Sequence, residues 1–456
     1  MAKNGKAANI ILKEGVFKMV SSSSILLCLS IALLVGLLLS RLAKYVQLPA
    51  VTAYLIAGVL IGPFCLGAIG VDGIGITENV VDRLGIISDV ALGFIAFAMG
   101  NEFRLAQLKK IGKQATVVGV FQAVFTTAVV DAFLIGLHFL MPDKFSLSAA
   151  IVLGAIATAT APAATLMVVR QYKAKGKLTD ILLPVVALDD AVGLMVFAVS
   201  FGIARALSVD GANASIVSII LEPIIEIVLS LALGFVMGLL FTLCERFFHS
   251  RSKRMAVSVT FVMMTVAIST MEYPKIFGIH IAFSSLLSCM MLGTVCCNIC
   301  DFSEELMERA DRWTAPILIL FFVISGAELK LNILGEFAVV IIGIVYIISR
   351  SLGKYFGARI SCKMTKCDIN IVKYLGITLL PQAGVALGMA NNALVLGAEG
   401  VMIKSITLFA ILIYEIVGPS LTKMSLTKAG DIKPHEKVSA REEARIALAE
   451  NSAIKH

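Results

Sequence analysis

Two adjacent aspartates, Asp189 and Asp190, stand in the middle of the apolar stretch 184-PVVALDDAVGLMVF-197. A carboxylate at the centre of a bilayer costs roughly 2.5–3.5 kcal/mol on insertion scales, and two neighbouring negative charges also repel each other. Consecutive side chains on a helix point about 100° apart, so the two carboxylates cannot face the same spot. We therefore expect one aspartate to bind an ion and the other to contact a partner side chain.

The same geometry argues against an enzyme. An intramembrane aspartyl protease needs two aspartates from different helices that face each other across the scissile bond, and no GxGD-like segment occurs here. The apolar segments also lack a Ser/His or zinc-ligand arrangement, and no glycine-rich phosphate loop is found. The CxxC of 296-CCNIC-300 has no second ligand pair at zinc-site spacing, which favours helix-end packing over a structural metal. The sequence therefore predicts neither catalysis nor a cofactor.

The segment 157-ATATAPAAT-165 carries residues that interrupt a helix. Pro162 removes a backbone hydrogen bond and disfavours helical structure in the residue before it. Thr158 and Thr160 offer hydroxyls that can satisfy the freed backbone groups or bind an ion. Non-helical backbone at membrane depth persists only where it is buried in protein or lines a cavity. This break is therefore a candidate for part of a functional site.

A second segment of this kind is 379-LLPQAGVALG-388, in which Pro381, Gln382 and Gly384 interrupt an apolar run. Each break is followed one helix later by an intramembrane acid: the aspartate pair after the first and Glu415 after the second. Matching breaks in inverted repeats are the best indication in a sequence of the midplane site of a transporter. Two ordinary proline kinks are the alternative interpretation.

Basic residues also fall inside an apolar segment. Arg350 and Lys354, in 350-RSLGK-354, are four residues apart and therefore share a helix face. A buried lysine is a natural partner for a buried carboxylate, because pairing offsets part of the desolvation of each group. Snorkelling to the membrane interface is the alternative. For two further acids in apolar segments, Asp131 and Glu226, we expect polar packing and no specific role.

The composition defines the class of protein. Of the 456 residues, 58% are hydrophobic and only 15% are charged, whereas soluble domains contain about 25% charged residues. The apolar runs are continuous and not alternating, which excludes an outer-membrane barrel. We predict an all-α polytopic membrane protein with thirteen transmembrane helices. The predicted helices cover residues 25–41, 48–66, 84–100, 114–139, 147–170, 179–207, 215–246, 255–272, 277–297, 313–331, 337–358, 370–396 and 402–425.

This assignment makes the fourth to sixth and the eleventh to thirteenth helices two copies of a three-helix unit. The copies are offset by an odd number of helices, so they run through the membrane in opposite orientations. Each copy contains one interrupted helix followed by a helix with a buried acid. The sequence therefore predicts inverted repeats with the site at the two interruptions.

The distribution of basic residues predicts the topology. About 26 Lys and Arg residues lie in the loops after odd-numbered helices and in the C-terminal tail, against about 9 in the N-terminal tail and the other loops. We expect an extracytoplasmic tail at 1–24, a transmembrane domain at 25–425 and a cytoplasmic tail at 426–456 in a cell membrane. The net charge of +8 reflects this bias and does not indicate nucleic-acid binding.

The sequence resembles the monovalent cation/proton antiporter superfamily, on its electrogenic sodium/proton branch with an aspartate pair, up to about residue 425. The segments 48-LPAVTAYLIAGVLIGP-63 and 94-FIAFAMGNEF-103 are similar to two early signatures of that family. The segment 188-LDDAVG-193 is similar to its ion-site motif, and 380-LPQAGVALG-388 to its second broken helix. The order and spacing of these pieces are more specific than any single one.

The resemblance implies roles for individual residues. Asp190 would bind the cation or the proton. Asp189 would pair with Lys354, or with Arg350 if the helix register differs by one turn. Thr160 would stand at the break of the first broken helix.

The resemblance also implies a homodimer in which a six-helix core, here about 114–207 and 337–425, moves against a dimerisation domain. Sodium or lithium ions would compete with protons for the same carboxylate by alternating access, with no cofactor and with membrane lipid as surroundings. Family members often have an acid where this sequence has Ala161, which leaves the positive helix ends at the break less well compensated.

Two other functions remain open. One is potassium/proton antiport on the same scaffold; the C-terminal tail is too short for a nucleotide-binding regulatory domain, which counts against the ligand-gated efflux type. The other is a sensor that does not transport. Such a protein would tolerate neutral residues at 189–190, which this chain does not have.

Overall fold

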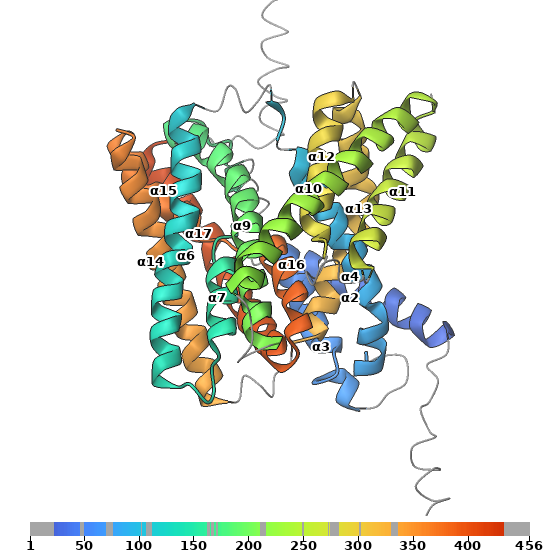
Figure 1. The fold of residues 1–456 in the computed structure, drawn as a ribbon, viewed down its shortest axis with the longest axis horizontal. Helices are drawn as coiled ribbons and strands as arrows, with labels where there is room; N and C mark the ends of the chain where they lie inside the picture. Colours follow the sequence, from blue (N-terminus) through green and yellow to red (C-terminus); the bar gives the residue numbers. More distant parts are fainter. Residues whose placement is uncertain are drawn as a thin grey trace, which may run out of the picture.

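The computed structural model describes residues 22–45, 50–69, 76–101, 103–105, 112–161, 165, 168–169, 172–209, 216–248, 250–271, 273, 282–300, 302–329 and 336–432. Within these residues the chain forms fourteen α-helices and two short 3-10 helices, with no strand (Figure 1). Eight of the helices are long and apolar enough to cross a membrane. The prediction of an all-helical membrane protein is therefore confirmed.

One group of helices, which we call the site bundle, occupies the left half of Figure 1. It contains α6 (Lys113–Leu140), α7 (Leu147–Ile156), α9 (Lys177–Val209), α14 (Phe337–Met364), α15 (Ile369–Thr378), α16 (Gly384–Asn392), η3 (Ala393–Leu396) and α17 (Ala398–Ala429). Helices α6 and α14 pack closely because small residues face the contact. A methyl group added at Gly353 or Gly357 of α14 would lie about 3 Å from the backbone of Thr126 or Gln122 of α6. This contact sets the register of α14 against α6.

A second group, the flanking bundle, occupies the other half of Figure 1. It contains α2 (Ser22–Tyr45), α3 (Ala50–Ile61), η1 (Leu66–Ile69), α4 (Glu78–Asn101), α10 (Ile216–Arg246), α11 (Arg251–Thr270), α12 (Ser285–Ile299) and α13 (Ser303–Ala327). Helices α3 and α13 meet at Gly58 and Gly326, where an added methyl group would lie about 2 Å from the backbone of the facing helix. Contacts this close let backbones pack without a hydrophobic driving force.

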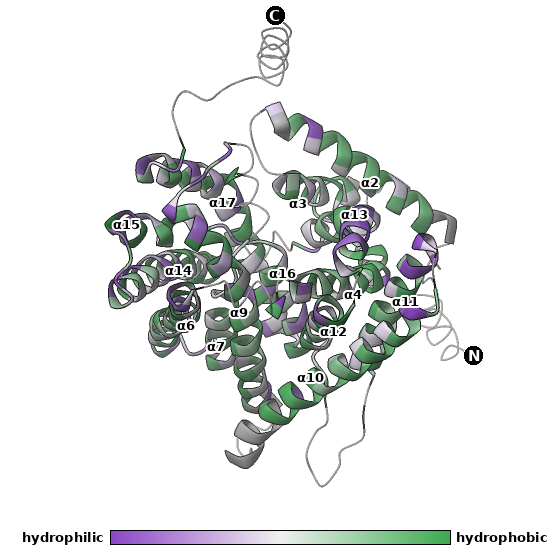
Figure 2. Cartoon of the chain, turned by 90° about the horizontal axis from the view of Figure 1, so that it is seen from above, coloured by the Kyte–Doolittle hydropathy of each residue, from purple (hydrophilic) through white to green (hydrophobic). Residues whose placement is uncertain are grey.

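The outer surface of both bundles is mainly apolar. In the view from above, α2 and α10 form part of the periphery and their ribbons are largely hydrophobic (Figure 2). Leu34 and Leu38 of α2 and Phe235 and Val236 of α10 are among the exposed large side chains. Exposed apolar surface of this extent is suited to contact with lipid tails, in agreement with a multi-pass membrane protein.

Two of the predicted spanning segments contain non-helical backbone. Helix α7 ends at Ile156, and residues 157–161 are not helical. Helix α15 ends at Thr378 and α16 begins at Gly384, with residues 379–383 between them. We call 157–161 the first break and 379–383 the second break. Pro162 lies outside the described residues.

Helix α13 begins at Ser303, ten residues before the predicted start at 313. Hydrophobicity alone missed this first part, because 303–312 is polar. Glu304 and Glu305 stand in the first helical turn, where negative charge is favourable. Arg309 also pairs with Glu305 one turn away, and such pairs stabilise exposed helix.

Candidate ion-binding site

The aspartate pair lies at the point where the two breaks meet. Asp189 and Asp190 are on α9 and are 0% and 2% exposed. The backbone N–H of Ala161, in the first break, donates a hydrogen bond of 2.9 Å to the carbonyl of Pro381, in the second. Two segments more than 200 residues apart in the sequence therefore touch beside two buried carboxylates.

Asp189 is surrounded by hydrogen-bond donors. The ammonium of Lys354 lies 2.5 Å from its Oδ2, and both side chains are fully buried. The hydroxyl of Thr160 and the side-chain amide of Gln122 also donate to this carboxylate. Arg350 makes no ion pair with Asp189, so of the two basic residues on α14 it is Lys354 that contacts it. Asp189 is therefore held as a partnered charge.

Asp190 has different surroundings. Its Oδ1 accepts a hydrogen bond of 3.3 Å from the backbone N–H of Thr160. Its Oδ2 is buried and has no hydrogen-bond partner within the described part of the chain. A buried polar atom without a partner is costly and calls for a functional explanation. Of the two aspartates, Asp190 is the one that retains a free position for a proton or a cation.

Arg350 joins the two breaks. Its Nε and Nη2 donate to the carbonyls of Ala157 and Ala159 at 3.0 and 2.7 Å, and its Nη1 donates to the carbonyl of Leu380 at 2.7 Å. Its guanidinium also lies over the ring of Tyr414, 4.4 Å from the centroid. Carbonyls at helix C-terminal ends carry partial negative charge, so a cation here satisfies them and opposes the helix dipoles.

Lys354 and Thr158 complete the first break. The Lys354 ammonium donates to the carbonyl of Thr158 and, at 3.0 Å, to the hydroxyl of Thr160. The hydroxyl of Thr158 donates to the carbonyl of Ala155 at 2.7 Å. The side chain of Thr158 is thus used to close the end of α7, and the side chain of Thr160 faces the charged residues.

Gln382 and Gly384 hold the second break in place. The amide of Gln382 donates to the carbonyl of Ile156 and to the hydroxyl of Tyr346, both at 3.0 Å. Gly384 faces the flanking bundle: a methyl group there would lie 3.7 Å from Phe322 of α13 and 3.8 Å from Ile95 of α4. The second break is therefore fixed on one side by hydrogen bonds and meets apolar side chains on the other.

Glu415 and Asp131 are two further acids of the site bundle, on α17 and α6. Glu415, on α17, is 1% exposed, and its Oε1 has no hydrogen-bond partner among the described residues. The carboxylate of Asp131 packs against Gly154, where an added methyl group would lie 1.7 Å from its Oδ1. Asp131 thus lies in the contact between α6 and α7, and because its Oδ1 has no hydrogen-bond partner among the described residues, the expectation of polar packing stays a prediction.

The remaining polar residues of the sequence analysis lie on the flanking bundle. Glu226 is half-buried on α10. Cys296, Cys297 and Cys300 are buried at the end of α12 and are not joined in disulfides. The thiol of Cys300 donates to Glu245 at 2.5 Å, so the end of this helix is joined to α10.

Sequence reasoning missed Gln122 and Tyr346. Gln122 is 0% exposed on α6 and donates to Asp189, and Tyr346 is 0% exposed on α14 and bonds to Gln382. An isolated glutamine in the apolar run 114–139 was a signal for the first residue. A tyrosine in an apolar helix gives no comparable signal, because its aromatic ring is largely apolar and packs well among apolar side chains.

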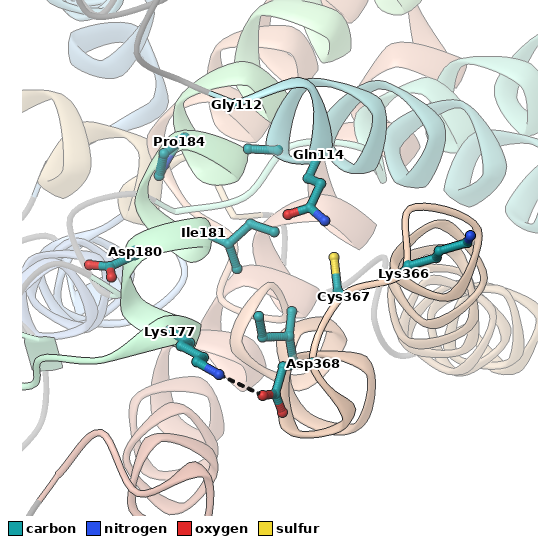
Figure 3. Close-up of a pocket in the computed structure, with 11 residues that line it drawn as sticks. Gly112, Gln114, Lys177, Asp180, Ile181, Pro184, Lys366, Cys367 and Asp368 are labelled. Atoms are coloured by element: carbon teal, nitrogen blue, oxygen red, sulfur yellow. Dashed lines mark hydrogen bonds and ion pairs between the residues drawn. The ribbon is translucent and has the colours of Figure 1, made fainter.

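A cavity of about 820 Å³ opens at the end of the site bundle where α6 and α9 begin (Figure 3). Its lining residues are Gly112, Gln114, Ala115, Lys177, Asp180, Ile181, Pro184, Lys366, Cys367, Asp368 and Ile371. Lys177 pairs with Asp368 across it at 3.1 Å. The backbone N–H of Asn370 and the Lys177 ammonium hold the pKa of Asp368 below its usual value, so it stays ionised at neutral pH. Apolar residues, including Val118 and Val185, are buried between the cavity and the aspartates.

The helical bundle and the charged crossing of two breaks define a membrane transporter. The family model for the sodium/hydrogen exchanger, transmembrane, matches residues 29–428. Since this is most of the 456 residues, the chain belongs to that family, which is a family of transporters and not of enzymes.

Individual relatives agree with this assignment. The Na(+)/H(+) antiporter NhaS4 of Synechocystis sp. is 23% identical over 411 residues, covering 88% of this chain and 96% of the relative. The sodium proton antiporter MjNhaP1 from Methanocaldococcus jannaschii at pH 8 has a similar structure, with a TM-score of 0.70, 17% identity and coverage of 88% of this chain and 97% of that one. An electron-microscopy structure of MjNhaP1 gives a TM-score of 0.64 at 16% identity, covering 89% and 98%. The two structures show that the fold is of the NhaP1 type.

Proposed function

We propose that the protein exchanges Na⁺, or Li⁺, for H⁺ across the membrane, and that the cation and the proton compete for Asp190. The observation that carries this proposal is the buried Oδ2 of Asp190, which has no hydrogen-bond partner among the described residues, beside a fully partnered Asp189. A bare carboxylate is costly to move past apolar residues. Only a loaded site should cross, and one ion gradient then drives the other.

The second part of the proposal concerns charge. We place the protein on the electrogenic branch, because Lys354 lies 2.5 Å from Asp189 in the pair next to the ion site. If the cation displaces a proton from this pair as well as from Asp190, more than one proton moves for each sodium ion. Transport then responds to membrane voltage. Rates that do not change under an imposed potential would indicate electroneutral exchange and a structural role for Asp189.

The third part concerns architecture. We infer that α6–α9 and α14–α17 are inverted repeats, within the proposed core ranges of about 114–207 and 337–425, and that this core moves against the flanking bundle in a homodimer. Apolar contacts support this, since Gly384 at the second break faces Phe322 and Ile95 of the flanking bundle. We further propose an extracytoplasmic N-terminus and a cytoplasmic C-terminus, with tails at 1–24 and 426–456.

The experiment uses the purified full chain in vesicles of defined orientation. Proton flux is measured on addition of Na⁺, Li⁺ or K⁺ in turn, with and without an imposed potential. Asp190→Asn keeps the shape of the side chain but removes its titratable charge, so exchange should fall to background while the protein still folds. Asp131→Asn is the matched control, because it neutralises another aspartate of the site bundle, which is half-buried, and should leave exchange near the wild-type rate.

Three outcomes separate the alternatives. Loss of exchange in Asp190→Asn alone supports the assignment. Wild-type flux in that variant would show that the ion site lies elsewhere. Flux driven by K⁺ but not by Na⁺ would favour potassium/proton antiport on the same scaffold.

A further inference from the structure

The ion pairs formed between described residues fall almost entirely within one bundle or the other. The pairs inside the flanking bundle and its adjoining loops are Arg104–Glu304, Arg251–Glu305, Arg254–Glu245, Arg309–Glu305 and Arg312–Glu308, and those inside the site bundle are Lys177–Asp368 and Lys354–Asp189. The exception is Lys404–Glu328, which joins α17 of the site bundle to the end of α13 in the flanking bundle. This pair therefore ties together the two parts that alternating access would separate.

The pair is mostly buried and is not explained by local helix stability. The side chains of Lys404 and Glu328 are 5% and 18% exposed. Glu328 is the C-cap residue of α13, at the negative end of the helix, where a carboxylate is unfavourable. Asp89 of α4 lies close enough to interact electrostatically with both partners. Lys404 thus brings a positive charge from the other bundle close to two acids at the boundary.

The pair lies at the opposite end of α17 from the cavity. Asp431 lies just beyond the C-terminal end of α17 and accepts hydrogen bonds of 2.7 and 2.8 Å from the backbone N–H and the hydroxyl of Thr179. Thr179 is two residues after Lys177, which lines the cavity, so this end of α17 is the cavity end. Lys404 is in the second turn of the same 32-residue helix. At about 1.5 Å per residue, roughly 40 Å of helix separates Lys404 from Asp431.

Two buried hydroxyls lie one turn further into the molecule than the pair. Ser325 precedes Glu328 by three residues on α13, and Thr407 follows Lys404 by three residues on α17, so each shares a helix face with its charged neighbour. Both residues are 0% exposed, and neither hydroxyl oxygen has a hydrogen-bond partner within the described part of the chain. Several other hydroxyls of the described structure share this property, but these two lie beside the pair between the bundles, where they suit a surface that becomes hydrated in another state.

We propose that Lys404 and Glu328 form a latch that holds the pathway between Asp190 and this end of the molecule closed. Opening of that pathway breaks the pair, and the hydroxyls of Ser325 and Thr407 then line the route that water and the cation take. The inference rests on the proposed alternating-access exchange and adds to it the residues that control one side. With the topology proposed above, this is the extracytoplasmic side.

A latch affects the two sides of the membrane in opposite directions. The apparent affinity for an ion falls with the fraction of protein in the state that can bind it. Removing the latch raises the fraction open to the latch side and lowers the fraction open to the cavity side. The half-saturating Na⁺ concentration should therefore fall on the first side and rise on the second.

The test measures Na⁺-dependent proton flux in right-side-out and everted vesicles, which present the two sides separately. Glu328→Gln and Lys404→Met should each shift the half-saturating Na⁺ concentration about threefold to tenfold, in opposite directions on the two sides. The double variant Lys404→Met/Glu328→Gln leaves no unpaired charge from the pair yet still lacks the latch, so the shifts should persist. The charge swap Lys404→Glu/Glu328→Lys should return both values toward those of the wild type. Arg312→Ala is the matched control, because it breaks an exposed pair inside α13 and should shift neither value.

The double variant decides between a latch and a merely structural pair. If the single variants lose stability and the double variant recovers both stability and wild-type Na⁺ dependence, the pair is structural and the proposal is overturned. The proposal would also be overturned if the half-saturating Na⁺ concentration shifted equally on both sides. The same holds if it did not shift in a variant whose melting temperature equals that of the wild type. An absence of Na⁺-driven flux in the wild type would instead count against the proposed function.

Discussion

The two breaks share a sequence pattern but differ in what they contact. The first break directs its polar groups at charged side chains: the carbonyls of Ala157 and Ala159 accept from Arg350, and the N–H of Thr160 donates to Asp190. It contributes directly to the proposed ion site. Its geometry is therefore linked to the charge state of the site.

The second break contacts mainly the first. The carbonyl of Pro381 accepts from Ala161, the amide of Gln382 donates to Ile156, and the hydroxyl of Thr160 reaches the carbonyl of Leu379 at 3.3 Å. Its groups hold the first break in position and do not reach the aspartates in the described structure. The two similar interruptions thus differ in their contacts, because the first donates hydrogen bonds to the aspartates of α9 and the second supports the first.

The largest effect should come from the residue that serves both breaks. Arg350→Ala leaves the carbonyls of Ala157, Ala159 and Leu380 without this donor, at about 1–3 kcal/mol each, so we expect a loss of roughly 3–9 kcal/mol in stability. The melting temperature in detergent measures this. Arg359→Ala, on the exposed side of the same helix, is the control and should have little effect. A melting temperature unchanged in Arg350→Ala would contradict the view that one side chain joins the breaks.

The second prediction concerns the first break alone. Lys354→Ala leaves Asp189 as an unpaired buried charge, at a cost on the order of 3–5 kcal/mol, and adding Asp189→Asn should recover part of the loss. A double-mutant cycle on melting temperature measures the coupling between positions 189 and 354. The same cycle for 189 and 350 should be close to additive. Additive losses of melting temperature for positions 189 and 354 would show that the two side chains do not interact.

A smaller effect should distinguish ligand from support. Thr160→Val removes a hydroxyl that contacts Asp189. It should therefore raise the half-saturating Na⁺ concentration clearly and change the melting temperature little. Gln382→Leu removes two neutral hydrogen bonds from the second break, so it should cost about 1–2 kcal/mol of stability and leave half-saturation nearly unchanged. Flux and melting measurements on both variants provide the comparison. If the two variants behave alike, the breaks do not differ in role.

The last prediction should leave activity unchanged and tests whether the breaks are inverted copies. A reporter fused after Lys433 should read as cytoplasmic, and a tag at residue 2 should be accessible from outside. This follows from the bias of basic residues toward alternate loops. If both ends were found on the same side, the number of spans would be even and the two breaks would not be related by inversion.

Much of the site could be read from single positions. The aspartate pair, Pro381 and the charges of α14 are conspicuous because each is costly or disruptive inside an apolar helix. The all-helical class followed from the length and continuity of the apolar runs. Polar helix extensions such as 303–312 could not be read in this way, because their stability comes from charge pairs and helix ends and not from hydrophobicity.

The sequence by itself determined the class of protein, the two breaks and the carboxylates between them, since these depend on local composition and the cost of burying charge. The choice of Lys354 over Arg350 as partner of Asp189 was decided only by the tertiary structure. So was the contact of Gln122 with the same carboxylate. Both depend on how α14 packs on α6 through Gly353 and Gly357, a contact between residues more than 200 positions apart. A shift of one turn exchanges residues four apart without changing the local pattern, so only packing between helices can set the register.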